Sequence, residues 1–157
     1  MKVFFPLILL LAAPRLWADP TQEAAELLQR HQGVVGIAAR IDAFSRGFLG
    51  FPYGDGGPLG EGTSGRYDQD PLYRFDTFDC TTFVETMLAL AHATDAADFA
   101  RHMDEIRYEN GVVDYTTRNH WPSLQWVPNN VQNGYLREIT REIAPQGVVK
   151  VARALID

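Results

Sequence analysis

The sequence changes character abruptly at Asp79 and Cys80, and this change limits the fold more than any other feature. Asp79 stands where a helix N-cap belongs, because its side chain can accept the free N–H groups of a first turn. Apolar residues at the spacing of one helical face follow at once: Phe83, Val84, Met87, Leu88 and Ala91. The pattern predicts a capped helix that begins at Cys80 and packs one face against a core.

The segment before this helix is rich in glycine. Residues 47–65 hold eight of the thirteen glycines, which disfavours a regular helix or strand. We therefore expect a long loop here, and long ordered loops are usually functional. Further upstream, apolar residues between positions 27 and 44 mostly fit helical faces and predict one or two amphipathic helices.

The remainder of the chain predicts a second helix and then strands. Thr94 can open a helix, and Asn110-Gly111 is a strong hairpin signal. Residues 112–127 are rich in β-branched and aromatic types and predict strands, whereas 136–143 fit a short helix and 148–156 a final strand. Helices followed by strands predict one α+β domain.

Residues 1–18 have the features of a signal peptide. Lys2 gives a positive start, residues 3–13 form an apolar run, and Ala18 supplies the small residue of a cleavage site. The run is shorter than the ~20 residues that cross a bilayer as a helix. We expect export to the periplasm or outside the cell, with residues 19–157 as a single domain and no membrane span in the mature chain.

The net charge of −6 excludes some partners. Nucleic-acid binding selects Lys and Arg patches, so an acidic chain is a poor candidate for it. The sequence has one cysteine, and in an oxidising compartment a lone cysteine cannot form an internal disulfide. One cysteine and scattered histidines form no cluster at the spacings of metal ligands, so we expect neither a metal nor a cofactor.

Cys80 is the strongest candidate for chemistry. In the first turn of a capped helix, free N–H groups and the helix dipole favour a thiolate, which is the reactive form of cysteine. Free cysteine is more often a small apolar core residue. Here, however, Cys80 is flanked by Asp79 and Thr81, and the apolar pattern begins only at Phe83. We therefore predict that Cys80 is a nucleophile.

A cysteine nucleophile needs a base, and His120 is the best of the four histidines. His31 lies at the polar end of a helix, and His102 lies in an exposed helix. His92 follows Cys80 by twelve residues, which places it about 18 Å along the helix. His120 stands in a predicted strand that could pack against the start of the Cys80 helix, so we predict that it accepts the thiol proton.

A third residue should orient the imidazole of His120. Four amide side chains follow it within reach of a neighbouring turn, and the sequence does not choose among them: Asn129, Asn130, Gln132 and Asn133. Asn129 and Asn130 could equally be turn or cap residues. Asn130 is kept as the candidate third catalytic residue.

Several blocks of the chain resemble one known family. They are Leu49-Gly50-Phe51-Pro52-Tyr53, the run from Phe78 to Glu85 around Asp79-Cys80-Thr81-Thr82, Ile106-Arg107-Tyr108, and Arg118-Asn119-His120 followed by Trp126. They resemble the DUF1460 branch of the NlpC/P60 superfamily, described as N-acetylmuramoyl-L-alanine amidase-like. The resemblance covers roughly residues 45–140.

The resemblance implies a papain-like α+β core in which the nucleophilic cysteine, at a helix N-terminus, packs on an antiparallel sheet that carries the histidine. It implies a peptidoglycan or muropeptide substrate, cleaved between the lactyl group of N-acetylmuramic acid and L-alanine, and no metal. It also implies that Tyr53 and Asp79 line the substrate site. Gln125 departs from the family pattern, where an acidic residue precedes the tryptophan.

Two alternatives stand beside the amidase. Many NlpC/P60 relatives are endopeptidases that cut the stem peptide. A different class is an inactive wall-binding remnant, because family members continue beyond the position of Asp157 and the domain is expected to be C-terminally short. The presence of both Cys80 and His120 favours an enzyme.

Overall fold

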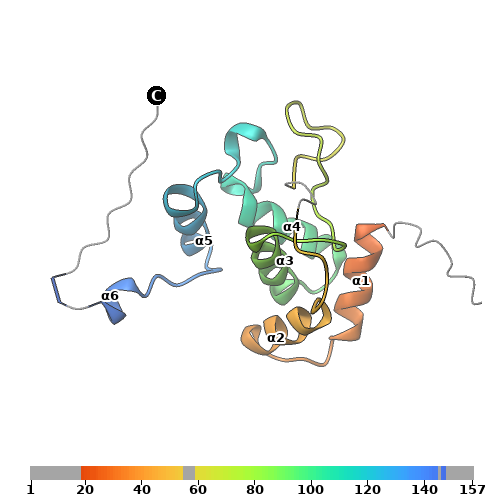
Figure 1. Cartoon of the computed structure of the whole chain (residues 1–157), viewed down its shortest axis with the longest axis horizontal. Coiled ribbons are helices and arrows are strands. Elements are labelled where there is room, and N and C mark those ends of the chain that lie inside the picture. Colours follow the sequence, from red (N-terminus) through yellow and green to blue (C-terminus); the bar gives the residue numbers. More distant parts are fainter. Residues whose placement is uncertain (1–18, 55–58, 145, 148–157) are drawn as a thin grey trace, which may run out of the picture.

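The structure is a computed structural model that describes residues 19–54, 59–144 and 146–147. Within these residues the chain is helical, and the helices follow the order shown in Figure 1. They are α1 (Pro20–Arg30), α2 (Ile37–Gly47), α3 (Cys80–His92), α4 (Ala96–Arg107), α5 (Val127–Gln132) and α6 (Thr140–Ile143), with single turns η1 (Glu109–Gly111), η2 (Tyr115–Thr117) and η3 (Pro122–Trp126).

The predicted antiparallel sheet under a papain-like core is wrong for the described residues. They contain two isolated bridges instead, Tyr53 with Phe78 and Tyr108 with Arg118. The predicted hairpin at Asn110 is a single turn, and the strands expected over residues 112–127 are replaced by η2 and η3. The strand expected at 148–156 lies outside the described residues.

Local chemistry explains why residues 112–127 form turns. The side chain of Asp114 accepts the N–H of Thr116 at 2.9 Å and begins η2. Pro122 begins η3 and has no N–H for a strand ladder. The aromatic and β-branched residues here suit a partly buried surface, which a packed loop provides as well as a sheet does.

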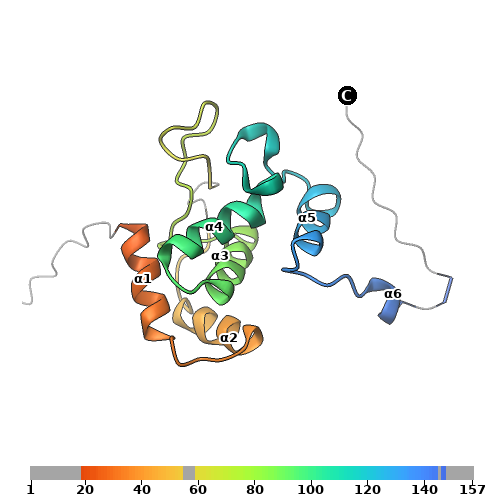
Figure 2. The same cartoon turned by 180° about the vertical axis from the view of Figure 1, so that it is seen from behind.

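The core is built around α3 and α4. Helix α2 packs on α3, and α1 packs on α4, so α3 and α4 lie at the centre in both views (Figures 1 and 2). Phe44, Leu90, Phe99 and Ile106 are fully buried between these helices and the loop before α3. The predicted helices therefore exist, although α4 is capped by Asp95 rather than by the expected Thr94.

The loop before α3 is held down by the end of α4. Arg107 donates from Nη2 to the carbonyl of Leu59 at 2.5 Å and from Nη1 to that of Leu72 at 2.8 Å. The hydroxyl of Tyr108 donates to the carbonyl of Gly60 at 2.8 Å. A Cβ at Gly60 would lie 2.3 Å from the carboxylate of Asp68, so glycine is required for this close approach. The glycine-rich segment is thus ordered where α4 binds it.

Helix α6 lies away from the other helices in both views (Figures 1 and 2). Helix α5 instead packs on η3 and on α4, and so borders the site described below. Among the residues that the structure describes, no helix has both the length and the apolar character needed to cross a bilayer.

Candidate active site

Cys80 is the first residue of α3, as the sequence predicts. The carboxylate of Asp79 accepts the N–H of Thr81 at 2.8 Å and that of Thr82 at 2.7 Å. The hydroxyl of Thr82 accepts the N–H of Asp79 at 2.9 Å, which completes a capping box. Cys80 is exposed, and the Asp79 carboxylate does not bind its N–H. An exposed thiol therefore lies at the positive end of a helix.

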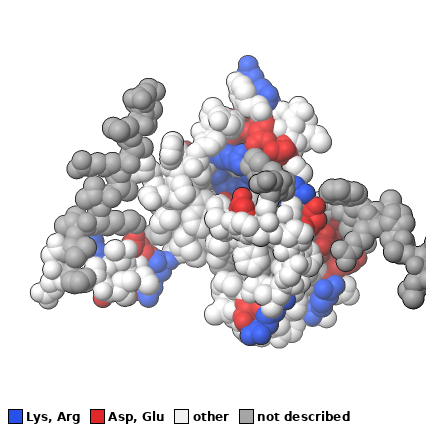
Figure 3. Space-filling model, viewed as in Figure 1, with Lys and Arg blue, Asp and Glu red and all other residues white. Residues whose placement is uncertain are grey.

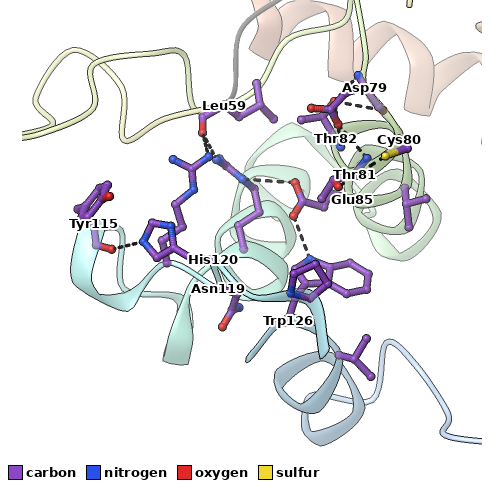
Figure 4. Close-up of a pocket in the computed structure, with 15 residues that line it drawn as sticks. Leu59, Asp79, Cys80, Thr81, Thr82, Glu85, Tyr115, Asn119, His120 and Trp126 are labelled. Atoms are coloured by element: carbon purple, nitrogen blue, oxygen red, sulfur yellow. Dashed lines mark hydrogen bonds and ion pairs between the residues drawn. The ribbon is translucent and has the colours of Figure 1, made fainter. Parts of the chain in front are cut away.

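A cavity of about 590 Å³ opens beside this thiol. The start of α3, the end of α4, Leu59 of the glycine-rich loop and residues between Tyr115 and Val127 line it (Figure 4). Cys80 and His120 both belong to the lining, on opposite sides of the cavity, with Glu85 between them in the view of Figure 4. The structure therefore brings the predicted nucleophile and base to one cavity from segments forty residues apart.

His120 is exposed and lies in an extended segment between η2 and η3, not in a strand. Its Nε2 lies 2.9 Å from the carbonyl oxygen of Tyr115, and the two rings are 4.7 Å apart. A carbonyl can only accept, so Nε2 must carry the proton, and the neutral imidazole has its lone pair on Nδ1. Among the hydrogen bonds of the described residues, none joins His120 to Cys80.

The candidate third residue, Asn130, lies outside this cavity lining. It is fully buried, and its Nδ2 donates to the carbonyls of Ile106 at 3.0 Å and Trp126 at 2.8 Å. Asn129 and Asn133 donate to the carbonyl of Glu105, and Gln132 is exposed. The three asparagines thus satisfy carbonyls that the end of α4 leaves free. The group that holds the imidazole here is the backbone of Tyr115.

Tyr53 borders a second, smaller cavity of about 200 Å³, which Cys80 also lines. Asp79 and Cys80 line both cavities, whereas the rest of the smaller one is mainly aromatic. The bridge between Tyr53 and Phe78 places the tyrosine here, and its side chain is 77% exposed. Tyr53 and Cys80 therefore line the same smaller cavity, and Tyr53 does not belong to the lining of the larger one.

Sequence reasoning missed Glu85, which lines the larger cavity. Only 7% of its side chain is exposed, and burial raises its pKa to about 7, although Arg107 and a hydrogen bond from Trp126 act in the opposite direction. The sequence feature that could have identified Glu85 is its position as a carboxylate inside the apolar run of α3. Such a residue is rarely buried unless it is paired.

The described residues contain no group of three or more His, Cys, Asp or Glu side chains arranged to hold a metal ion. Positive and negative side chains alternate over the face seen in Figure 3 and form no single charged surface there. Several Arg residues pair with a nearby carboxylate, as Arg118 does with Asp68 at 2.7 Å.

Comparisons with known proteins place this geometry in a family. The family model of AmiA-like proteins, described as N-acetylmuramoyl-L-alanine amidase-like, matches residues 43–156. The comparison with curated proteins gives no match.

Two similar solved structures carry related descriptions. One is a DUF1460-family protein of Legionella pneumophila, with 38% identity and a TM-score of 0.73, covering 80% of this chain and 42% of its own. The other, an N-acetylmuramoyl-L-alanine amidase of Bacteroides uniformis, has 30% identity and a TM-score of 0.50, covering 60% of this chain and 41% of its own.

A third solved structure, a putative xylanase of Bacteroides fragilis, has 36% identity and a TM-score of 0.50 and covers 64% of this chain and 43% of its own. The chain thus spans about two fifths of the length of these structures. The family match extends over more than half of the chain, and on this ground the protein belongs to the AmiA-like family of N-acetylmuramoyl-L-alanine amidase-like proteins.

Proposed function

We propose that this protein is a cysteine amidase that hydrolyses the bond between N-acetylmuramic acid and L-alanine in peptidoglycan or its fragments. The observation that carries the proposal is the exposed thiol of Cys80 at a capped helix N-terminus, in one cavity with His120. The family match supports an amide substrate, and the amidase of Bacteroides uniformis supports this particular bond.

The proposed reaction is an acyl transfer in two halves. Cys80 Sγ attacks the lactyl carbonyl carbon while its proton passes to Nδ1 of His120. The N–H of Cys80 stabilises the oxyanion that forms. The C–N bond then breaks, and His120 returns the proton to the leaving amino group of L-alanine. Water, deprotonated by His120, hydrolyses the thioester and restores the thiol.

Both cavities border Cys80 and provide room beside the reacting sulfur. The larger, at about 590 Å³, lies on the His120 side, and the smaller, at about 200 Å³, lies on the Tyr53 side. Asp79 and Cys80 border both, so a substrate bound across them would place its scissile bond at Cys80. Tyr53 and Asp79 are accordingly proposed to bind substrate.

In the structure without substrate, the thiol of Cys80 and the imidazole of His120 are not hydrogen-bonded to each other. Hydrogen bonds of catalytic pairs are often long in free enzymes and tighten in the substrate complex. We propose that Nδ1 of His120 reaches Cys80 transiently in the free protein and that substrate binding holds it there. Membership of the NlpC/P60 superfamily, and export directed by residues 1–18, are further parts of this proposal.

Incubation with defined muropeptides, followed by mass spectrometry of the products, tests the function. The native protein should release the stem peptide with a free N-terminal L-alanine, whereas Cys80→Ala and His120→Ala should release none. Glu109→Gln, which changes an exposed residue that lines neither cavity, is the control and should act like the native protein. A cut inside the stem peptide would identify an endopeptidase, and binding to the wall without cleavage would identify a binding module.

A further inference from the structure

Glu85 is a buried carboxylate between the two sides of the proposed site. It lies five residues after Cys80 in α3, among the buried residues Thr86, Met87 and Leu88. Burying a carboxylate in such surroundings is costly unless it is paired and hydrogen-bonded. Both oxygens of Glu85 have a partner: Trp126 Nε1 donates to Oε1 at 2.9 Å, and Arg107 Nε lies 3.5 Å from Oε2 (Figure 4).

The tryptophan contact connects Glu85 to the chain after His120. The carbonyl of Trp121, the residue next to His120, accepts the N–H groups of Leu124, Gln125 and Trp126 at 3.2, 2.8 and 3.1 Å. The Gln125 side chain accepts the N–H of Trp121 at 3.0 Å. Turn η3 is therefore a closed unit, and fixing the indole of Trp126 fixes the position at which the chain leaves His120.

The arginine contact connects Glu85 to the chain before His120. The carbonyl of Arg107 accepts the N–H of Asn119 at 2.9 Å, and Tyr108 forms a bridge with Arg118. The side chain of Arg107 is 3% exposed. Both flanks of His120 are thus attached to a residue that binds the Glu85 carboxylate.

We propose that Glu85 is a positioning residue that sets the separation of Cys80 and His120. Its backbone belongs to the helix that begins at Cys80. Its carboxylate contacts Trp126 and Arg107, which fix the chain after and before His120. This inference rests on the proposed function, because the separation matters only if the two residues act as a pair. A misplacement of about 1 Å in such a pair can cost about 10²-fold in rate.

Each of two substitutions weakens one of the two contacts of the Glu85 carboxylate, with Arg107 or with Trp126. Glu85→Gln keeps an oxygen that can accept from Trp126 but loses the charge that faces Arg107. Trp126→Phe keeps an aromatic ring against the core but removes the donor to Glu85. Glu109→Gln is the control, since Glu109 is exposed. Thermal unfolding shows that each variant is folded, and where Glu85→Gln fails to fold, Trp126→Phe carries the test.

The rate at which iodoacetamide alkylates the protein is the readout. Cys80 is the only cysteine of the chain, so the rate reports on this thiol alone. We expect Glu85→Gln and Trp126→Phe to lower the rate toward that of His120→Ala, to have no further effect in the His120→Ala background, and to lower kcat on muropeptides by about 10²-fold with little change in KM.

Two results would overturn the inference. Either both variants alkylate at the native rate, or they slow alkylation equally with and without His120, as a general loosening of α3 would. His120→Ala by itself tests the proposed catalytic pair, because alkylation that is independent of His120 contradicts that pair. The alkylation rates do not depend on which bond of the substrate is cut. A failure of the amidase assignment would instead appear in the muropeptide products.

Discussion

The Nε2 atom of His120 lies 2.9 Å from the backbone carbonyl oxygen of Tyr115, and this contact selects the tautomer of the imidazole. Because the carbonyl needs a proton from Nε2, the neutral ring must accept at Nδ1. Nitrogen-15 NMR of the histidine rings at about pH 9, where imidazole is neutral, should show His120 as the Nε2–H form. A dominant Nδ1–H form would mean that the proposed base cannot accept through Nδ1.

The cap of α3 predicts a local loss of stability. Asp79→Ala removes the acceptor for the N–H groups of Thr81 and Thr82 and should lower the free energy of unfolding by about 1 kcal/mol, measured by urea denaturation. Asp95→Ala, which removes the cap of α4, should cost a similar amount. Only Asp79→Ala should also reduce hydrolysis, and an equal loss of activity in both variants would show that stability alone explains it.

Glu85 predicts how stability depends on pH. Its pKa is raised by burial to about 7, so the folded state holds this proton more tightly than the unfolded state does. The stabilisation is complete below about pH 4.5 and is lost as pH rises through about 7, where Glu85 ionises.

The comparison with Glu85→Gln isolates this effect. Between about pH 5 and pH 8 the native protein should lose about 3 kcal/mol relative to the variant. The difference matters because burial also raises the pKa of Asp104, to about 6, and this second carboxyl adds a dependence of the same sign to both proteins. Stability curves that stay parallel across this pH range would contradict the prediction.

Tyr53 predicts a binding effect without a folding effect. Its side chain is 77% exposed, so Tyr53→Ala should leave the urea midpoint unchanged, yet it should raise KM because the ring borders the smaller cavity beside Cys80. Leu49→Ala is the control, since Leu49 is 79% exposed in the same loop but does not border this cavity. Unchanged kinetics in Tyr53→Ala would remove the tyrosine from the substrate site.

The start of α3 could be predicted from the sequence because its causes are local. An aspartate cap and an apolar helical face act within a few residues. The cap is found as expected, and Met87, Leu88 and Ala91 of the predicted face are buried, but Val84 is exposed. His120 could be selected only by excluding the other three histidines, and it is the one histidine that lines the larger cavity in the described residues.

Two features could not be predicted: that the described residues form turns in place of the expected sheet, and which group orients the imidazole of His120. Each depends on contacts between distant segments. The aromatic and β-branched residues after Gly111 suit any partly buried surface. The chain forms turns here instead of strands, because Asp114 caps η2 and Pro122 begins η3. Asn130 satisfies carbonyls at the end of α4, twenty-four residues away, while a backbone carbonyl holds His120. A backbone group leaves no mark in the sequence, because every residue has one.

The most direct test of the central claim is to trap the intermediate on Cys80. Hydroxylamine added during turnover of a muropeptide intercepts a thioester and releases a hydroxamate of the acyl group, which mass spectrometry identifies. The account predicts the hydroxamate of the N-acetylmuramoyl lactyl group from the native protein and none from Cys80→Ala. Cleavage of the substrate without any hydroxamate, or a hydroxamate of a stem-peptide residue, would contradict it.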